Sequence, residues 1–434
     1  MEGRKLKYAA GVQSFEKLRR GGNVYVDKTR FVWELVNQES PIFLSRPRRF
    51  GKSLFLSTLE AYFNGQKDLF QGTYIYFLES DWKKYPVVHI DLNSGNYQAV
   101  DGLKDVISRQ LDRYEEVWNI APSKSKSLEG RLENLILKAY QKFNSEVVLL
   151  FDEYDKPLIS NLSDISLLDE MRSILKPIFG LTKSLDKYIR FAMITGVSRF
   201  SKTSIFSDVN NLVDISFVEE FNDICGISES ELNENFQESI SNLAQKLKLD
   251  FDRTKELLKT NYDGYHFANP EIAEGIYNPY SLMNVFKFNK ISDYWFDTGT
   301  PTFLVKDLIS DNFDYKKLEG MTVSEVKLQQ GDALAGDPVV LLFQTGYLTI
   351  KGMPDPELFT IGFPNEEVER SFYNLLLSYS LRGQYTDTVA DVQLMKMDIQ
   401  NGNAESLVNR MDALFADIPY RLREGRENYF QETM

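Results

Sequence analysis

The segment Pro41-Ile42-Phe43-Leu44-Ser45-Arg46-Pro47-Arg48-Arg49-Phe50-Gly51-Lys52-Ser53 joins a short apolar run, a basic turn and the triplet Gly-Lys-Ser. The apolar run predicts a buried strand, and the apolar residues that recur at helical spacing after the triplet predict a helix. A Gly-Lys-Ser triplet between a strand and a helix is typical of a phosphate-binding loop, in which backbone N–H groups, the lysine and the hydroxyl hold a triphosphate and its Mg²⁺.

Each residue of this loop has an expected role. We expect Lys52 to contact the β- and γ-phosphates and Ser53 to hold Mg²⁺. The neighbouring residues are expected to surround the nucleotide: Arg48, Arg49, Phe50, Gly51 and Leu54. For the two arginines, ion pairs with acids of the protein remain an alternative.

One position departs from the usual loop, because Arg46 stands where the first glycine is expected. Glycine permits a backbone shape that a side chain discourages, so the loop is expected to take a slightly different turn, with Pro47 fixing φ.

A second apolar run, Val147 to Phe151, ends in Asp152-Glu153. An uninterrupted run of this kind favours a strand that is covered on both faces of a parallel sheet. We expect Asp152 to hold Mg²⁺ and Glu153 to orient or deprotonate the attacking water. The alternative is an ordinary acidic turn at the end of a strand.

A third run, Ile189 to Ile194, is followed by Thr195-Gly196-Val197-Ser198-Arg199. Thr195 and Ser198 are expected to lie near the γ-phosphate. Arg199 is a candidate for neutralising charge in the transition state, within its own subunit or across to a neighbour. A solvated loop arginine is the alternative.

Strands that alternate with helices predict an α/β P-loop NTPase with a mainly parallel sheet, followed by helical and winged-helix-like regions. We expect this nucleotide-binding domain at residues 1–216 and a helical domain at 217–330. Two strand-like runs, Val339 to Ile350 and Leu358 to Phe363, suggest the wing of a winged-helix-like module at 331–383, with Gly352-Met353-Pro354 between them. The last segment, 384–434, reads as a helical tail or the start of a truncated domain.

The bulk composition limits the class of protein. With 434 residues, two to three domains are expected. The 50 basic and 63 acidic residues give a net charge of 50 − 63 = −13. This negative charge argues against binding of nucleic acid or an anionic membrane through the overall charge of the protein. A single cysteine, no signal-like N-terminus and no membrane-length apolar run indicate a cytoplasmic protein. His89, His266 and Cys225 do not have zinc-site spacing.

Several motifs together resemble a family of bacterial AAA-ATPase-like proteins. They are YVDKT at 25–29, RPRRFGKS at 46–53, LLFDEYDKP at 149–157, TGVSRFSKTSIFSDVNNL at 195–212 and YWFDTGTPTFL at 294–304. The resemblance implies ATP and Mg²⁺ as cofactors and makes the arginine at position 46 a family trait. Members often continue into a PD-(D/E)XK nuclease-like domain, whose acids and lysine we do not find in this sequence.

These observations lead to three hypotheses. The first is a P-loop ATPase that binds Mg-ATP and hydrolyses it to drive a conformational change. The second is a nucleotide-gated interaction module, in which ATP sets the relative position of the α/β and helical/winged parts and the output is binding of a partner or of nucleic acid. A homo-oligomer is a separate candidate assembly. The third is the ATPase half of a DNA-directed defence or mobile-element system that works with a nuclease, and it rests on the resemblance alone. Direct contact with nucleic acid and the base preference stay open.

Overall fold

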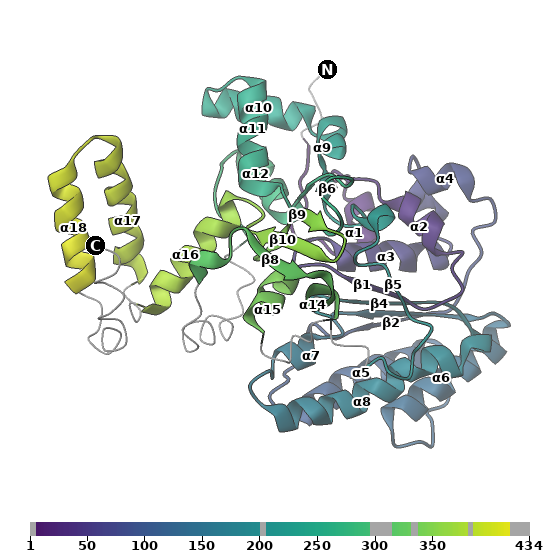
Figure 1. Ribbon diagram of the computed structural model, residues 1–434. Coiled ribbons are helices and arrows are strands. Elements are labelled where there is room, and N and C mark those ends of the chain that lie inside the picture. Colours follow the sequence, from purple (N-terminus) through teal and green to yellow (C-terminus); the bar gives the residue numbers. More distant parts are fainter. Residues whose placement is uncertain (1–5, 200–204, 296–314, 331–336, 381–384, 417–434) are drawn as a thin grey trace.

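A computed structural model describes residues 6–199, 205–295, 315–330, 337–380 and 385–416 (Figure 1). Its centre is a sheet of five parallel strands in the order β2-β3-β4-β1-β5. The strands are β1 Ile42–Ser45, β2 Val87–Asp91, β3 Val147–Asp152, β4 Ile189–Gly196 and β5 Val213–Asp214. The predicted α/β class with a mainly parallel sheet is confirmed.

The sheet brings the ends of the predicted functional strands together. β4 lies between β1 and β3, with Ser45 level with Gly196 and Phe151 level with Ile194. The residues that follow β1, β3 and β4 therefore emerge at the same edge of the sheet, where ligands of open parallel sheets bind.

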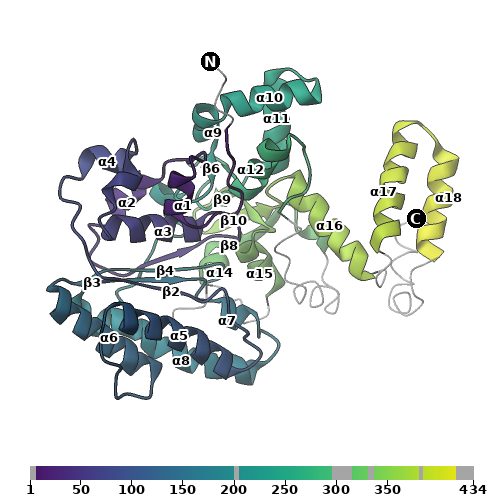
Figure 2. The same cartoon turned by 180° about the vertical axis from the view of Figure 1, so that it is seen from behind.

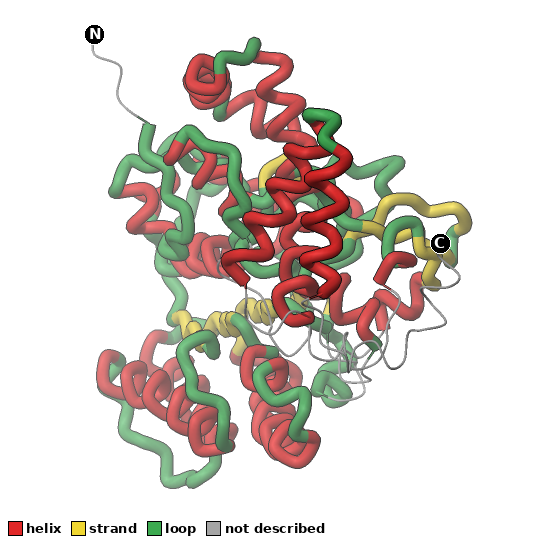
Figure 3. Tube along the Cα trace, turned by 90° about the vertical axis from the view of Figure 1, so that its left-hand side faces the viewer, coloured by secondary structure: helices red, strands yellow, loops and turns green. Residues whose placement is uncertain are grey.

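Helices cover both faces of this sheet, which explains why its strands are mainly apolar. All six residues of β3 are buried. In Figure 1, α5, α6 and α8 lie beneath the sheet and α1 to α4 lie above it, and Figure 3 shows the strands between these layers. The helices are α1 Phe15–Arg20, α2 Thr29–Leu35, α3 Lys52–Phe63, α4 Tyr74–Leu78, α5 Val100–Val117, α6 Leu128–Phe143, α7 Lys156–Ile159 and α8 Ile165–Ser184. Short 3₁₀ turns lie at Lys67–Phe70 and Asp186–Tyr188.

The chain after the sheet is mainly helical, as expected, and packs against the carboxyl edge of the sheet (Figures 1 and 2). Its own small core is formed by side chains such as Leu232, Leu243, Leu258 and Leu282. The elements are a 3₁₀ turn at Glu219–Phe221, β6 Ile227–Ser228, α9 Glu229–Asn235, α10 Gln237–Leu247, α11 Phe251–Tyr262, β7 Ile276–Tyr277 and α12 Pro279–Phe288.

A three-stranded antiparallel sheet, β8-β10-β9, follows. Its elements and neighbours are a 3₁₀ turn at Tyr315–Lys317, β8 Met321–Ser324, α14 Glu325–Gln330, α15 Pro338–Thr345, β9 Thr349–Asp355, β10 Leu358–Gly362 and α16 Glu366–Ser380. The motif at 294–304 lies mostly outside the described residues.

The predicted strand over Val339–Ile350 is wrong for its first part, which forms the helix α15. Asp337 caps this helix by accepting the N–H groups of Val339 and Val340, Pro338 occupies its first turn, and Gly346 ends it at φ 90°. Every residue from Val339 to Thr345 is buried, so the run lacks the polar face that marks most helices. Likewise, Gly352-Met353-Pro354 lies inside β9 and is not the connection between two strands.

The last described helices form a hairpin, α17 Tyr385–Gln400 and α18 Ala404–Ala416, that stands away from the rest of the molecule in both views (Figures 1 and 2). Among the described residues, no helix is both long enough and apolar enough to cross a bilayer. The domain boundaries given above stay predictions.

Candidate functional site

The loop between β1 and α3 has the backbone of an anion-binding turn. Arg49 and Gly51 adopt left-handed conformations, with φ of 71° and 102°, and α3 begins directly at Lys52. Glycine suits position 51 because of this φ, since open space surrounds the place where a Cβ would lie.

The loop presents backbone donors at the start of α3. Within the described residues, the N–H groups of residues 49–53 donate to no protein acceptor, and no side chain caps the helix. Unpaired N–H groups at the positive end of a helix dipole form a site for an anion such as a phosphate.

Lys52 lies buried beneath this loop, with 3% of its surface exposed. Its Nζ donates to the carbonyl oxygens of Arg46 and Pro47, at 2.9 and 3.2 Å, and lies 3.7 Å from a carboxylate oxygen of Glu153. The ammonium group is therefore held between the phosphate loop and the acid that follows β3.

Arg46 points away from the phosphate side of the loop. Its guanidinium is buried and donates to the carbonyl oxygens of Ser45, Ser216 and Phe221 at 2.8–2.9 Å, while it lies 4.0 Å from the ring centre of Phe267. Burial lowers the pKa of Arg46 to about 10. Arg46, which stands in the usual glycine position, thus stabilises the loop from the side that faces away from the phosphate site.

Asp152 and Thr195 meet at the ends of β3 and β4. The Thr195 hydroxyl donates to Asp152 Oδ1 at 2.7 Å, and the Glu153 N–H donates to the same oxygen at 3.0 Å. Both side chains are buried. Thr195 is therefore positioned to orient the carboxylate of Asp152.

Glu153 turns toward the phosphate loop through an unusual backbone. Its φ is 52°, a left-handed value that costs free energy for a residue with a side chain. Burial raises the pKa of Glu153, and the nearby charge of Lys52 opposes this effect. This left-handed turn directs the Glu153 carboxylate toward Lys52 of the phosphate loop.

Asp155 is a buried residue of this site that the sequence analysis did not identify. Its Oδ2 accepts hydrogen bonds from the N–H groups of Val197 and Ser198 and from the Ser198 hydroxyl, the last at 2.6 Å. Ser198 therefore ties the end of β4 to the turn after β3. The spacing Asp152-x-x-Asp155 was a signal that could have pointed to this role.

Arg199 lies on another surface. It forms an ion pair with Asp214, its guanidinium lies 4.8 Å from the ring centre of Phe217, and its N–H donates to Gln344 at 3.1 Å. These contacts direct the side chain past β1 toward β5 and α15, where it lines a small pocket with Arg46 and Pro47 and not the cavity over the phosphate loop.

A cavity of about 350 Å³ opens over the phosphate loop. The loop residues 48–54 and Glu153 line it, whereas Asp152, Thr195, Ser198 and Arg199 do not. Its other walls include residues 9–13, 24–26 and 28 near the N-terminus, Lys156, and residues 224–227, 279, 280 and 283 of the helical region. The cavity therefore lies between the α/β domain and the helical region.

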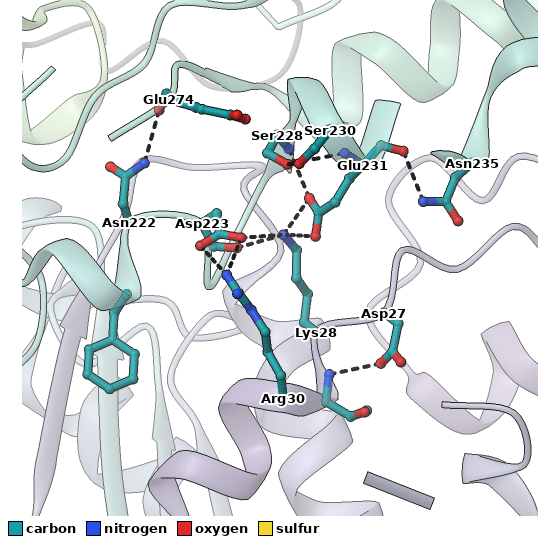
Figure 4. A network of polar contacts seen from close by, with 12 residues as sticks. Asp27, Lys28, Arg30, Asn222, Asp223, Ser228, Ser230, Glu231, Asn235 and Glu274 are labelled. Carbon is teal, nitrogen blue, oxygen red and sulfur yellow. Dashed lines mark hydrogen bonds and ion pairs between the residues drawn. The ribbon is translucent and has the colours of Figure 1, made fainter. Parts of the chain in front are cut away.

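An ion-pair network joins these two regions next to the cavity (Figure 4). Lys28 donates to both carboxylate oxygens of Glu231, at 2.6 and 2.7 Å, and to the carbonyl oxygen of Asp223. Arg30 binds the Asp223 carboxylate at 2.6 and 2.7 Å. Glu231 also completes a capping box with Ser228 at the start of α9, so the network fixes the first helix of the helical region.

The donors available at the loop suit Mg²⁺. Among the described residues, no three His, Cys, Asp or Glu side chains gather into a metal cage. Mg²⁺ at nucleotide sites does not need one, because it takes most of its oxygen ligands from phosphates and water and one or two from the protein. Ser53, which lines the cavity, and the Asp152 carboxylate offer such hard oxygen donors.

Comparison with known proteins agrees with this geometry. A model of the family described as "Predicted AAA-ATPase" matches residues 9–206, which include the phosphate loop, Asp152-Glu153 and Arg199. A protein of Azotobacter chroococcum mcd 1, described as an uncharacterized protein in the vnfD 5′ region, is 34% identical over 420 residues. That alignment covers 95% of this chain and 78% of the relative.

The chain belongs to the predicted AAA-ATPase family. Membership of this family supports a P-loop fold that binds nucleotide. The loop at the start of α3 is the part of this fold that would bind the phosphates. The arrangement of β1, β3 and β4 in this AAA-ATPase-like chain agrees with that assignment.

Two archaeal structures also match at low identity. The Orc1 protein of Aeropyrum pernix, solved in complex with DNA, is 11% identical with a TM-score of 0.26, and the match covers 79% of this chain and 90% of that one. Cdc6p of Pyrobaculum aerophilum is 12% identical with a TM-score of 0.22, covering 78% and 88%.

Proposed function

We propose that this chain binds Mg-ATP in the cavity over the phosphate loop and hydrolyses it. The observation that carries the proposal is the contact between Lys52 and Glu153, 3.7 Å apart, beside the unpaired N–H groups that begin α3. A lysine for the outer phosphates and an acid for the attacking water belong at the same end of a nucleotide.

Each residue has a role in this proposal. The N–H groups of residues 49–53 bind phosphate oxygens, and Lys52 exchanges its loop carbonyls for the β- and γ-phosphates. Ser53 and Asp152 hold Mg²⁺, which when bound offsets the negative charge of the phosphates. Thr195 keeps the Asp152 carboxylate oriented. Glu153 accepts a proton from the attacking water.

We expect the cavity to accept adenine in preference to guanine. Proteins that select guanine commonly place a carboxylate against the N–H groups of its ring edge. Among the described lining residues the acid is Glu153, which is engaged with Lys52. The remaining walls include apolar side chains such as Val12, Ile227 and Met283, which can pack against the face of a purine ring.

Steady-state hydrolysis with three proteins tests the proposal. Wild type is expected to release phosphate from ATP in the presence of Mg²⁺, and Lys52→Ala and Glu153→Gln are each expected to reduce kcat by about 10²-fold or more. Glu153→Gln should still bind ATP, because the change removes a base and not a phosphate ligand. Lys138→Ala and Glu116→Gln, on exposed faces of α6 and α5, are the matched controls. Equal turnover in wild type and Glu153→Gln would contradict the role of Glu153.

The second function favoured by a specific observation is nucleotide-gated movement. The cavity is lined by both the α/β domain and the helical region, so a bound nucleotide would contact both. In this form of the proposal, ATP sets the position of the helical region, and the output is a changed affinity for a partner or a second copy of the chain. Identical elution volumes and identical DNA affinity in nucleotide-free, ADP and non-hydrolysable ATP states would exclude it.

A further inference from the structure

Asp155 is a buried acid to which the proposed hydrolysis gives no role. It follows Glu153 by two residues, none of its surface is exposed, and it does not line the cavity. Burying a carboxylate costs free energy unless hydrogen-bond donors surround it. The donors that hold Asp155 therefore indicate what this residue does.

Three hydrogen bonds hold Asp155, and all of them come from the residues that follow β4. Its Oδ2 accepts the N–H groups of Val197 and Ser198, at 3.0 and 2.5 Å, and the Ser198 hydroxyl at 2.6 Å. Ser198 is itself fully buried and does not line the cavity. Its hydroxyl is therefore directed at Asp155 and not into the cavity.

Tyr154 adds two hydrogen bonds between the same two segments. Its N–H donates to the Thr195 carbonyl at 3.1 Å, and its hydroxyl donates to the Ser198 carbonyl at 3.0 Å. Gly196 permits this close approach, because a Cβ at that position would lie 2.5 Å from the Tyr154 ring and 2.7 Å from Asp155 Oδ1. Residues 154–155 are thus held against residues 195–198 by backbone and side-chain atoms.

These contacts bear on the backbone of Glu153. Its φ of 52° is a conformation that a residue with a side chain keeps only when its surroundings enforce it. Before the turn, the Glu153 N–H donates to Asp152 Oδ1, which also accepts the Thr195 hydroxyl. After the turn, Asp155 accepts the Ser198 hydroxyl. Two hydroxyl groups at the end of β4 therefore hold the aspartates before and after Glu153.

We propose that Asp155 and Ser198 are positioning residues, which keep Glu153 in the left-handed conformation that directs its carboxylate at the phosphate loop. In this conformation a carboxylate oxygen of Glu153 lies 3.7 Å from Lys52 Nζ. Without the Asp155 contacts the turn would relax, and the carboxylate would move away from the water that it must deprotonate. The inference rests on the proposed ATPase function and adds two residues that act through Glu153.

The first test compares kcat and the Kd of a non-hydrolysable ATP analogue in three variants and wild type. We expect kcat to fall about 10²-fold in Asp155→Ala and about tenfold in Ser198→Ala, which loses one of the three hydrogen bonds. The analogue Kd should change less than about threefold in both, because the phosphate loop stays in place. Asp155→Asn keeps an oxygen acceptor for the same donors and should retain more activity than Asp155→Ala.

Thr182→Ala is the matched control for the loss of a buried hydroxyl group. Thr182 is buried in α8, and its hydroxyl donates to the Phe179 carbonyl at 2.7 Å. The change should lower the free energy of unfolding about as much as Ser198→Ala does, as urea unfolding measures, and should leave kcat unchanged. If Asp155→Ala does not fold, Ser198→Ala decides the outcome. Equal kcat in wild type and folded Ser198→Ala overturns the inference.

A second test asks whether Ser198 acts through Glu153. In the Glu153→Gln background, Ser198→Ala should slow single-turnover phosphate release by less than about twofold, because the base that it positions is already absent. A further fall of about tenfold in this background, or a rise of the analogue Kd by about tenfold, would show that Ser198 acts on the nucleotide by another route and overturn the inference. A wild type without turnover would instead contradict the proposed ATPase itself.

Discussion

Arg46 shows how one residue can differ from a common pattern without closing the phosphate site. Its side chain leaves the loop on the side opposite to the cavity, where three carbonyl oxygens and the ring of Phe267 receive the guanidinium. Lys52 then uses the Arg46 carbonyl as one of its own acceptors. The arginine therefore shapes the loop through its contacts and leaves the phosphate side to backbone donors.

Restoring the common glycine is expected to harm the protein. Arg46→Gly removes the donor for buried carbonyls of Ser45, Ser216 and Phe221, and we expect the free energy of unfolding to fall by about 3 kcal/mol. Urea unfolding measures this change. Arg109→Ala, which removes an exposed pair with Asp105 on α5, should have little effect. A more stable and more active Arg46→Gly protein would show that the arginine is a defect of the loop.

The buried carboxyl group of Glu367 should make the stability of the protein depend on pH. Its carboxylate accepts hydrogen bonds from the N–H groups of Tyr294 and Trp295 and from the Ser281 hydroxyl, and burial raises its pKa to about 7. The folded protein keeps this proton up to about pH 7, whereas the unfolded chain releases it near pH 4.5. The free energy of unfolding should therefore fall as the pH rises from 4.5 to 7.

Glu367→Gln removes this titration while keeping the size of the side chain. Relative to wild type, the variant should gain about 2–3 kcal/mol between pH 4 and pH 8, because its side chain stays neutral in both states. Thermal or urea unfolding at several pH values measures the difference between the two proteins. A difference that is the same at pH 4 and pH 8 would contradict the raised pKa.

At the scale of elements, strands covered on both faces were the easiest to predict. The apolar runs of β1 and β3 have no polar interruption and that of β4 has one, Arg190 near its start, and each run is followed by polar residues that emerge at one edge of the sheet. α15 failed for the same reason, since a helix buried on all sides has no polar face to reveal its period. β8 was missed because its four residues do not form a continuous apolar run.

The Lys28–Glu231 pair joins an element of the α/β domain to the first helix of the helical region, and its energetic coupling can be measured. Lys28→Met, Glu231→Gln and the double variant form a double-mutant cycle in which the glutamine preserves the α9 capping box. We expect a coupling of about 1–3 kcal/mol, because both side chains are largely buried. The exposed pair Arg20–Glu16 is the control, with a smaller coupling. Equal coupling in the two pairs would mean that the network does not hold the regions together.

At the scale of the whole molecule, the cavity depends on segments that are far apart in the sequence. The loop and Glu153 could be predicted because they follow strands that the hydrophobic pattern reveals. Residues 9–13, 224–227, 279, 280 and 283 could not, because no local pattern tells which distant segments will pack over a loop. The same holds for Arg199, whose pairing with Asp214 depends on how β4 and β5 lie on either side of β1.

A calorimetric titration of wild type and Lys52→Ala with a non-hydrolysable ATP analogue and Mg²⁺ tests whether the loop after β1 holds a triphosphate. Wild type should bind one analogue per chain, and Lys52→Ala should show at least a hundredfold weaker affinity or no measurable binding, because the ammonium group lies where the outer phosphates would be bound. Unfolding curves of the two apo proteins would establish that both are folded. Equal affinity in the two folded proteins would contradict the assignment of this loop as the nucleotide site.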